Sequence, residues 1–427
     1  MPINYINKLR LFQRDARLFL LVMSITNFAH IGMYIMIFNL YLLRLGYDIA
    51  FIGLINGTAQ LAMALFSIPA GLLGRRFTNR RMLLVGVGMA FVGFGALPLA
   101  EVFSETDRPT SMMSAWLMIA NALGWLGAAS FAVNMNPYLM SITDAGERQH
   151  VFSVRHAIMP LAGFGGTLFA GFLPGVFANT LNVSIDGPIP YRYVLFLAAS
   201  LLIPAWFVLK TTHPQIEEGQ SSQNATKADT QTDTQSTKMP TGVMVFMATV
   251  VLLQIAGYNS AQTFFNVYLD DGLRLPTATI GMLVSTAQLL GVPMALLAPF
   301  LVTRWGSRNA ITLGILGMAI ALIPLAWIPH WRAAGVGYMG VIALFAFTSP
   351  IFAIYQQESV PIAWRSTLSG AILMTTGLGR AGIALSGGYL ISNFGYSTFF
   401  TLGAILATVG GLLFWGHRQH SPLHNHT

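Results

Sequence analysis

The chain has no cysteine, which excludes disulfides, thiolate metal sites and thiol catalysis. Charge is scarce as well: Asp, Glu, Lys and Arg make up 9% of the 427 residues, against about 25% in an average soluble domain. Hydrophobic residues make up 54%, and the mean hydropathy is +0.62. A soluble protein of this composition would expose large apolar patches. We therefore expect an integral membrane protein.

Long apolar runs supply the membrane-spanning segments. A run of about 18 or more apolar residues is long enough to cross a bilayer as a helix, and the sequence has twelve such runs. Those in the first half are 18–43, 50–74, 82–102, 112–140, 151–177 and 191–210. Those in the second half are 241–268, 277–303, 309–328, 333–357, 364–393 and 396–417. The sequence therefore predicts an all-α membrane protein with twelve transmembrane helices, the first of which is retained rather than cleaved.

Lysine and arginine cluster on one side of these spans. With the amino terminus inside the cell, 17 of the 23 basic residues fall in inner segments, five fall in outer loops, and Arg380 lies within a span. The positive-inside rule then places both termini in the cytoplasm. The net charge of +8 reflects this topology. We therefore expect a bacterial inner-membrane protein that binds no nucleic acid.

Two parts of the chain, about half its length apart, are nearly the same. Phe38-Asn39-Leu40-Tyr41-Leu42 recurs as Phe265-Asn266-Val267-Tyr268-Leu269, displaced by 227, and Thr58-Ala59-Gln60-Leu61 recurs as Thr286-Ala287-Gln288-Leu289, displaced by 228. The segment 212–240 between them is rich in Gln, Ser, Thr, Asn and Asp and is too polar to bury a core. We predict two pseudo-symmetric six-helix bundles, 1–211 and 241–427, joined by a disordered cytoplasmic linker, 212–240. Related membrane bundles are typical of a transporter with a substrate cavity between them.

The loop after the second span reads Gly71-Leu72-Leu73-Gly74-Arg75-Arg76-Phe77-Thr78-Asn79-Arg80-Arg81. It resembles the signature loop of the major facilitator superfamily, in which a Gly is followed four and five residues later by Asp-Arg and then by Gly and further basic residues. Val302-Thr303-Arg304-Trp305-Gly306-Ser307-Arg308 resembles the degenerate second copy that those proteins carry. The resemblance implies the fold of that family and secondary transport by alternating access, in which two halves rock about a central site (the rocker-switch).

This chain departs from the family pattern at two positions, since Arg75 stands where the family has Asp and Thr78 where it has Gly. In the family, that Asp helps to lock the two halves on the cytoplasmic side. Here the acids of the neighbouring cytoplasmic loop are the ones available to pair with arginine. The predicted gating residues are Gly71, Arg75, Arg76, Arg80, Arg81, Asp144, Glu147 and Arg304. The alternative is that these arginines only set topology and bind anionic lipid headgroups.

Arg380 lies about sixteen residues into the eleventh predicted span, too deep for its side chain to reach the headgroups comfortably. An intramembrane charge is expensive and marks a functional site or a buried pair. A guanidinium binds a carboxylate or phosphate through two parallel hydrogen bonds, so Arg380 is a candidate anchor for an anionic substrate. The structural alternative is an arginine that satisfies backbone carbonyls or a polar neighbour such as Gln60 across the interface between the halves.

His30 lies near the middle of the first span, where Asn27, His30 and Tyr34 share one helical face through their i, i+3, i+7 spacing. None of the 15 acids falls at the middle of a span. His30 is therefore the candidate for carrying a coupling proton. The alternative is a neutral imidazole that is hydrogen-bonded between helices.

Neutral polar and aromatic side chains complete the predicted substrate site. They come from the fourth, seventh and tenth spans, and are Asn121 and Trp125, then Gln254, Tyr258, Asn259 and Gln262, then Tyr355 and Gln356. The repeated Asn39 and Asn266, and Gln60 and Gln288, are interpreted as scaffold residues, because the two walls of a substrate site need not be alike. A cavity of this composition suits an amphipathic or anionic organic molecule.

The sequence therefore predicts a monomeric secondary transporter of a small organic solute, with no enzyme activity, metal or other cofactor. The pattern Met159-Pro160-Leu161-Ala162-Gly163-Phe164-Gly165-Gly166 has the proline and glycines of a motif of drug/proton antiporters. It lacks the Gly-Pro pair at the expected spacing, which weakens the drug-efflux assignment without removing it, and we expect efflux from the loose resemblance to that branch. One alternative is a proton-linked importer of an organic anion or a sugar. Another is a non-transporting membrane scaffold or sensor, although the 29-residue linker is too short and polar to form a sensing domain.

Overall fold

The computed structural model describes residues 12–103, 109–213, 241–361 and 364–417. Within these residues all of the regular secondary structure is helical, with turns and loops between the helices. Eleven helices are long and apolar enough to cross a membrane. The last of them, Thr367–Gly416, spans 50 residues and is broken at Gly395, whose φ of 81° and ψ of 168° are not helical. Its two parts correspond to the eleventh and twelfth predicted spans. The expectation of an all-α membrane protein is confirmed.

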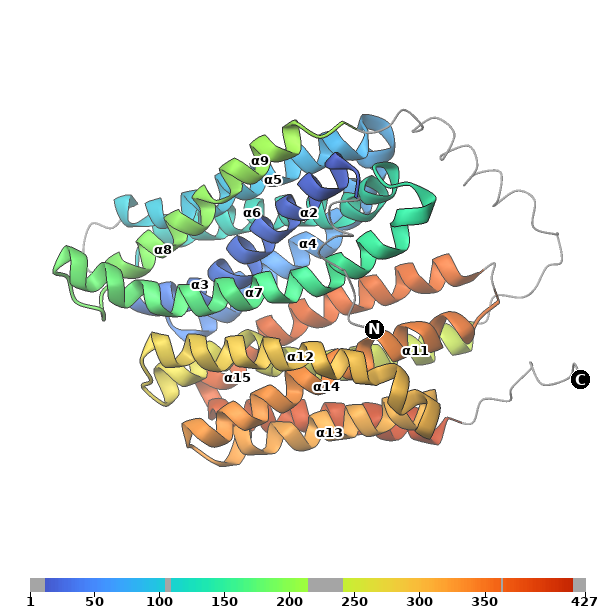
Figure 1. The fold of residues 1–427 in the computed structure, drawn as a ribbon. Helices are drawn as coiled ribbons and strands as arrows, with labels where there is room; N and C mark the ends of the chain where they lie inside the picture. Colours follow the sequence, from blue (N-terminus) through green and yellow to red (C-terminus); the bar gives the residue numbers. More distant parts are fainter. Residues whose placement is uncertain (1–11, 104–108, 214–240, 362–363, 418–427) are drawn as a thin grey trace, which may run out of the picture.

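The first six spans form one bundle (Figure 1). Its helices are α2 (Arg14–Thr26), η1 (Asn27–Tyr34), α3 (Ile35–Arg44), α4 (Ile49–Phe77), α5 (Asn79–Ala96), η2 (Leu97–Phe103), α6 (Ser111–Ser141), α7 (Ala145–Leu181), α8 (Ile189–Ser200) and α9 (Leu202–Lys210). The first span is continuous through α2, η1 and α3, and η1 is a π-helix.

The remaining spans form the second bundle, which lies alongside the first (Figure 1). Its helices are α11 (Thr241–Val267), η3 (Tyr268–Gly272), α12 (Thr277–Trp305), α13 (Ser307–Trp327), α14 (Trp331–Glu358) and α15 (Arg365–Gly416). The starts of α2 and α11 and the ends of α9 and α15 lie toward one side of the molecule. We call this side, which we expected to be cytoplasmic, the linker face, and the opposite side the far face.

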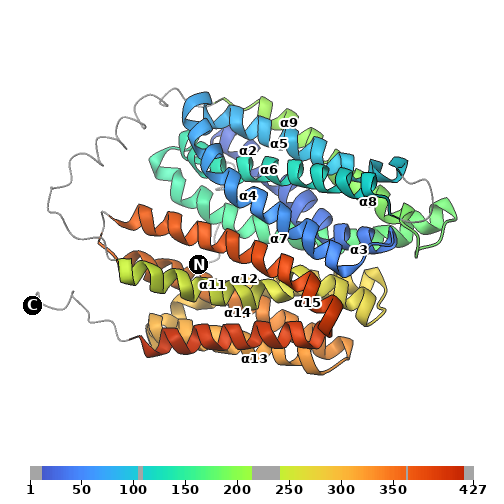
Figure 2. The ribbon, with the colours of Figure 1, turned by 180° about the vertical axis from the view of Figure 1, so that it is seen from behind.

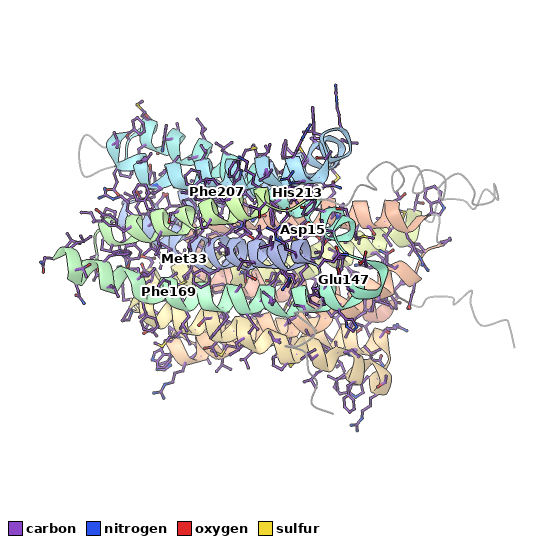
Figure 3. All side chains as sticks on the ribbon, turned by 45° about the horizontal axis from the view of Figure 1, so that its top comes forward. Asp15, Met33, Glu147, Phe169, Phe207 and His213 are labelled. Carbon is purple, nitrogen blue, oxygen red and sulfur yellow. The ribbon has the colours of Figure 1, made fainter. Side chains whose placement is uncertain are left out.

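The chain stays attached to the first bundle slightly beyond the end of α9. Thr212, where we expected the linker to begin, is fully buried and its Oγ1 lies 2.5 Å from the Oη of Tyr138. The backbone N–H of His213 donates to Asp15 of α2 at 3.2 Å, and Figure 3 shows these two residues together near the linker face. The rest of the predicted linker, 214–240, lies outside the described residues.

Two helix pairs hold the bundles against each other. α4 packs against α15, which Figure 2 shows from behind, and α7 packs against α12. Glycines bring both pairs into backbone contact toward the far face: a Cβ added to Gly53 would lie 2.6 Å from the Cα of Gly388, and one added to Gly281 would lie 2.7 Å from the Cα of Gly171. Small residues allow membrane helices to approach this closely.

Large apolar side chains cover the outside of both bundles. Leu65, Ile119 and Leu296 are 62%, 70% and 75% exposed. In water such a surface would aggregate, whereas in a bilayer it faces lipid tails. The polar side chains are consequently left for the interior and for the two faces.

Candidate functional site: a cavity between the bundles

A cavity of about 410 Å³ lies between the two bundles. Its wall on the first bundle comes mainly from η1, α4, α5 and α6, with single or few residues from α2, α3, α7 and α9, and its wall on the second comes from α11 and α15. The polar and charged side chains in the wall are Thr26, Asn27, His30, Tyr34, Asn39, Asn56, Gln60, Trp125, Tyr258, Asn259, Gln262, Thr263, Asn266 and Arg380. Among the described residues that line it, none is Asp or Glu. The wall therefore carries the permanent positive charge of Arg380 and no fixed negative charge.

The π-helix η1 presents the first wall residues. Asn27, His30 and Tyr34 all line the cavity, as their spacing predicted. The widened turn begins at Asn27, whose side-chain amide donates to the backbone O of Met23 at 2.9 Å. Single π-turns are frequent at functional sites of helices. Here the π-helix coincides with the part of the first span that faces the cavity.

Four ring-bearing residues pack together in the first-bundle wall, and we call them the aromatic box: His30, Tyr34, Phe94 and Trp125. The imidazole of His30 stacks on Phe94, with ring centroids 4.9 Å apart, and meets Trp125 edge-on at 5.0 Å. Tyr34 lies 4.2 Å from Phe94. The Tyr34 hydroxyl donates to Asn121, whose amide in turn donates to the backbone O of Ile55 at 3.2 Å. Asn121 is fully buried and fixes the box without lining the cavity.

The second-bundle wall is polar. Tyr258 stacks on Phe345 at 3.8 Å, and Gln262 accepts a hydrogen bond from the Tyr338 hydroxyl at 3.3 Å. Beside them Asn259 and Arg380 face the cavity. Gln60 of the first bundle also lines it, but no hydrogen bond joins Gln60 to Arg380 among the described side chains. The structural pairing that the sequence offered for Arg380 is therefore absent from this conformation.

Four nitrogen atoms in the wall are buried without a hydrogen-bond partner. They are His30 Nε2, Trp125 Nε1, Asn259 Nδ2 and Arg380 Nε. The tryptophan, asparagine and arginine nitrogens can only donate. A buried donor left unpaired costs about 1–3 kcal/mol. These donors gather in the cavity wall, which is the arrangement expected where a ligand with acceptor atoms completes the site.

Four of the predicted substrate contacts do not line the cavity. Gln254 is buried and donates to Thr348 at 3.2 Å. Tyr355 packs edge-on against Phe414, and Gln356 is 7% exposed. Asn121, as described, supports Tyr34. Conversely, Phe94 and Asn56 line the cavity and were not singled out in the sequence, because an isolated Phe or Asn in an apolar span carries no positional signal.

The repeated asparagines close the cavity toward the far face, and they do so symmetrically. Asn39 donates to the backbone O of Thr263 at 3.1 Å, and Asn266 donates to the backbone O of Met36 at 3.1 Å. Asn266 and Thr263 lie 227 positions after Asn39 and Met36, so the repeat found in the sequence converts one bond into the other. In each bundle the same asparagine side chain therefore donates to the same backbone position of the other bundle, which is a contact suited to the scaffold role that we expected for these residues.

An ion pair closes the far face beyond the asparagines. Arg44, at the end of α3, makes two hydrogen bonds to Asp270 of η3, at 2.7 and 2.6 Å. The carboxylate side chain is 4% exposed. Tyr191 of α8 approaches the same guanidinium at 3.3 Å, and its hydroxyl lies 2.7 Å from the Oγ1 of Thr277 on α12. The pair is bidentate and joins the two bundles, with a buried carboxylate and a guanidinium whose side chain is 18% exposed.

The predicted gating residues lie at the linker face. Glu147 and Asp144 accept hydrogen bonds from Gln13, at 3.2 Å from its backbone N–H and at 2.5 Å from its side chain. Arg80 donates to the backbone O of Lys210 at 2.6 Å, and Arg76 lies over the ring of Phe77 at 5.6 Å. Arg81 and Arg304 are exposed, and Gly71 faces Val133 of its own bundle. The side chain of Arg75 is outside the described ones.

Among the side chains that the structure describes, the ion pairs are Arg44–Asp270, Arg192–Glu101 and Arg274–Asp271, all near the far face. The pairing of Asp144 or Glu147 with arginine is not among them. Of these described pairs Arg44–Asp270 joins the two bundles, whereas Arg192–Glu101 and Arg274–Asp271 each lie within one bundle. The gating role expected at the linker face stays a prediction.

Comparisons with known proteins match these features. The family model described as Major Facilitator Superfamily matches residues 20–384. An uncharacterized MFS-type transporter of Mycobacterium tuberculosis (strain ATCC 25618 / H37Rv) is 24% identical over 382 residues, which are 86% of this chain and 82% of that relative.

Solved structures share the fold at low identity. An inward open conformation of the xylose transporter XylE from E. coli gives a TM-score of 0.72 at 15% identity, over 93% of this chain and 95% of that one. A mutant of the nucleoside transporter NupG gives a TM-score of 0.72 at 15% identity, over 94% of this chain and 99% of that one. A bacterial metal transporter gives a TM-score of 0.70 at 16% identity, over 95% of this chain and 99% of that one. These neighbours are named for unrelated substrates, so they show the fold and leave the substrate open.

Proposed function

This chain belongs to the major facilitator superfamily, and we propose that it exports a small organic solute by alternating access through the cavity between its two bundles. The family and fold make it a secondary transporter, a multi-pass integral membrane protein and not an enzyme. Its curated relatives are bacterial, in keeping with an inner-membrane location.

One observation carries the proposal: a cavity between the bundles, with polar side chains in a mainly apolar wall, is sealed toward one face by inter-bundle bonds. Alternating access requires such a seal to break while the opposite face closes. Export follows from the loose resemblance to the drug-efflux branch, although the segment Met159–Gly166 lacks the Gly-Pro pair of that branch at the expected spacing. The expected orientation, with the linker face in the cytoplasm, would let this conformation load solute from the cell interior. Import of an organic anion or a sugar remains the rival direction and substrate.

The absence of native cysteine makes a direct test possible. In Met63→Cys a thiol is placed in the cavity wall, and it is labelled with a membrane-impermeant maleimide in right-side-out and in inverted vesicles. Alternating access predicts labelling from both faces, because both conformations are visited. Labelling from one face only would remove the transport mechanism and favour the scaffold. Leu65→Cys, two residues away and on the lipid-facing side, is the control and should react from neither face.

A further inference from the structure

We propose that the substrate is an organic anion that carries a planar aromatic ring. This inference rests on the proposed function and deepens it by naming the substrate class. It comes from the unequal chemistry of the two cavity walls: one bundle supplies aromatic faces, and the other supplies positive charge and donors.

The aromatic half of the site lies in the first bundle. His30, Phe94 and Trp125 pack with centroids 4.9–5.0 Å apart, in stacked and edge-on geometries. All three line the cavity together with Tyr34. The rings largely cover one another, since Tyr34, Phe94 and Trp125 are 3%, 4% and 9% exposed. The parts that reach the cavity can contact another ring, and such aromatic pairs contribute beyond the area that they bury. The Nε1 of Trp125 and the Nε2 of His30 are the polar atoms of the cluster that lack a partner.

The charged half of the site lies in the second bundle. Arg380 brings a guanidinium into the wall, and Asn259 sits in the same wall with its amide nitrogen unpaired. Since no described lining residue is Asp or Glu, the protein supplies no counter-ion to the arginine inside the cavity. A guanidinium without a counter-ion in a membrane interior is completed by a ligand carboxylate or phosphate.

The donor excess argues against other solute classes. An organic cation would face Arg380 with no carboxylate to receive it. A neutral sugar has hydroxyls that both donate and accept, and it has no flat ring for Phe94. The cavity volume of about 410 Å³ lies in the range that holds a small organic ligand. A flat anion satisfies the free donors and covers the aromatic faces at once.

The division between bundles has a mechanistic consequence. A ring alone would touch one bundle and an anion alone would touch the other. Only a molecule with both parts joins the two walls, so only that molecule would stabilise the state in which the bundles close around it. Differential binding to that state is what allows a ligand to shift the conformational equilibrium.

A matched series of probes separates the two requirements. Naphthalene-2-carboxylate is an aromatic anion, decahydronaphthalene-2-carboxylate is its saturated counterpart, naphthalene-2-methanol is its neutral counterpart and 2-naphthylmethylamine is its cationic one. Binding to the purified full-length protein in lipid nanodiscs is measured by titration calorimetry. We expect naphthalene-2-carboxylate to bind about tenfold or more tightly than the alcohol or the amine. It should bind about threefold to tenfold more tightly than the saturated acid.

Two variants assign each preference to its wall. Arg380→Gln should abolish the advantage of the carboxylate over the alcohol and leave the advantage of the ring. Phe94→Leu should abolish the advantage of the aromatic acid over the saturated acid and leave the advantage of the carboxylate over the alcohol. Arg17→Gln removes an exposed charge of α2 at the linker face, and Phe172→Leu removes an exposed ring of α7; both controls should bind all four probes as the unchanged protein does.

Three results would overturn the inference. The first is tightest binding of the amine or alcohol, the second is equal binding of the saturated and aromatic acids, and the third is no detectable binding of any probe at millimolar concentration. A preference that survives both Arg380→Gln and Phe94→Leu would overturn its assignment to this cavity. None of these results touches the proposed transport mechanism, which the two-sided labelling of Met63→Cys tests without any substrate.

Discussion

At the scale of single residues, the clearest strain lies in the loops that carry the family signature. Thr78 has φ 76° and ψ 140°, and Gly306, displaced from it by 228, has φ 77° and ψ 152°. This region is essentially restricted to glycine, and a non-glycine residue there costs about 1–3 kcal/mol. The threonine that stands at position 78 in place of the family's glycine therefore raises the free energy of the folded state.

Swapping the two residues should change stability in opposite directions. Thr78→Gly should raise the thermal midpoint, and Gly306→Thr should lower the free energy of unfolding by about 1–3 kcal/mol, both for conformational reasons alone. A Cβ at Gly306 meets no atom within 4 Å, so no clash contributes. Thermal unfolding in detergent checks both. Gly370→Thr, at a helical glycine that is equally open, is the control, and an equal loss there would refute the strain argument.

His30 is the described histidine that lines the cavity. If it carries the coupling proton, His30→Gln should abolish solute accumulation driven by a pH gradient in vesicles and leave binding measurable, because glutamine keeps polarity and does not titrate near neutral pH. Full pH-driven accumulation by the variant would dismiss the histidine as the proton carrier. Gln254→Ala, on a buried residue outside the cavity wall, serves as the comparison.

Residue spacing predicted part of the site and missed another part. The i, i+3, i+7 pattern placed Asn27, His30 and Tyr34 on the wall that they occupy. The pairing of Arg44 with Asp270 was not predicted, because Arg44 was read as a loop residue and its partner lies 226 positions away. A signal was present: the repeat aligns Arg44 with Asp271, so the matched helix ends carry opposite charges.

At the scale of helices, the twelve spans followed from apolar length, whereas the π-helix η1 did not. A π-turn and an α-turn have the same apolar composition, and only the surrounding packing distinguishes them. The fifth and eleventh spans are rich in glycine, but the sequence does not show which of these glycines meet across the bundles. That depends on the tilt of each helix, which neighbouring helices set.

Glycine contacts between the bundles should control the far face. Gly171→Ala would place a methyl group about 2.8 Å from the Cα of Gly281, closer than packed atoms tolerate, so α7 and α12 must separate there. We expect Met63→Cys to react faster from the far face in this background. Gly175→Ala lies on the same helix with nothing within 4 Å of the added methyl. An equal acceleration in both backgrounds would argue against a specific contact.

At the scale of the whole molecule, the far face is held by a buried ion pair between bundles. Removing one partner of such a pair leaves an uncompensated charge and is strongly unfavourable. Asp270→Asn should therefore destabilise this conformation relative to one open to the far face. Far-face labelling of Met63→Cys should rise about tenfold or more, while linker-face labelling falls.

The neighbouring acid provides the matched control for that variant. The Asp271 side chain is 37% exposed and lies 3.8 Å from Arg274, which is 83% exposed. Exposed pairs contribute about 0–1 kcal/mol, so Asp271→Asn should leave the labelling nearly unchanged. If the two variants behave alike, the buried pair does not hold the conformation.

The reciprocal bonds of Asn39 and Asn266 carry one last consequence. A contact in which residue i of one unit meets residue j of the other, and j meets i in return, defines an isologous interface, the kind found in twofold homodimers. The protein therefore has the contact geometry of a dimer whose subunits have been fused into one polypeptide. Because the same contact is made twice about the twofold axis, opening the far face must break both copies together, so these two amides act as one matched latch between the fused subunits.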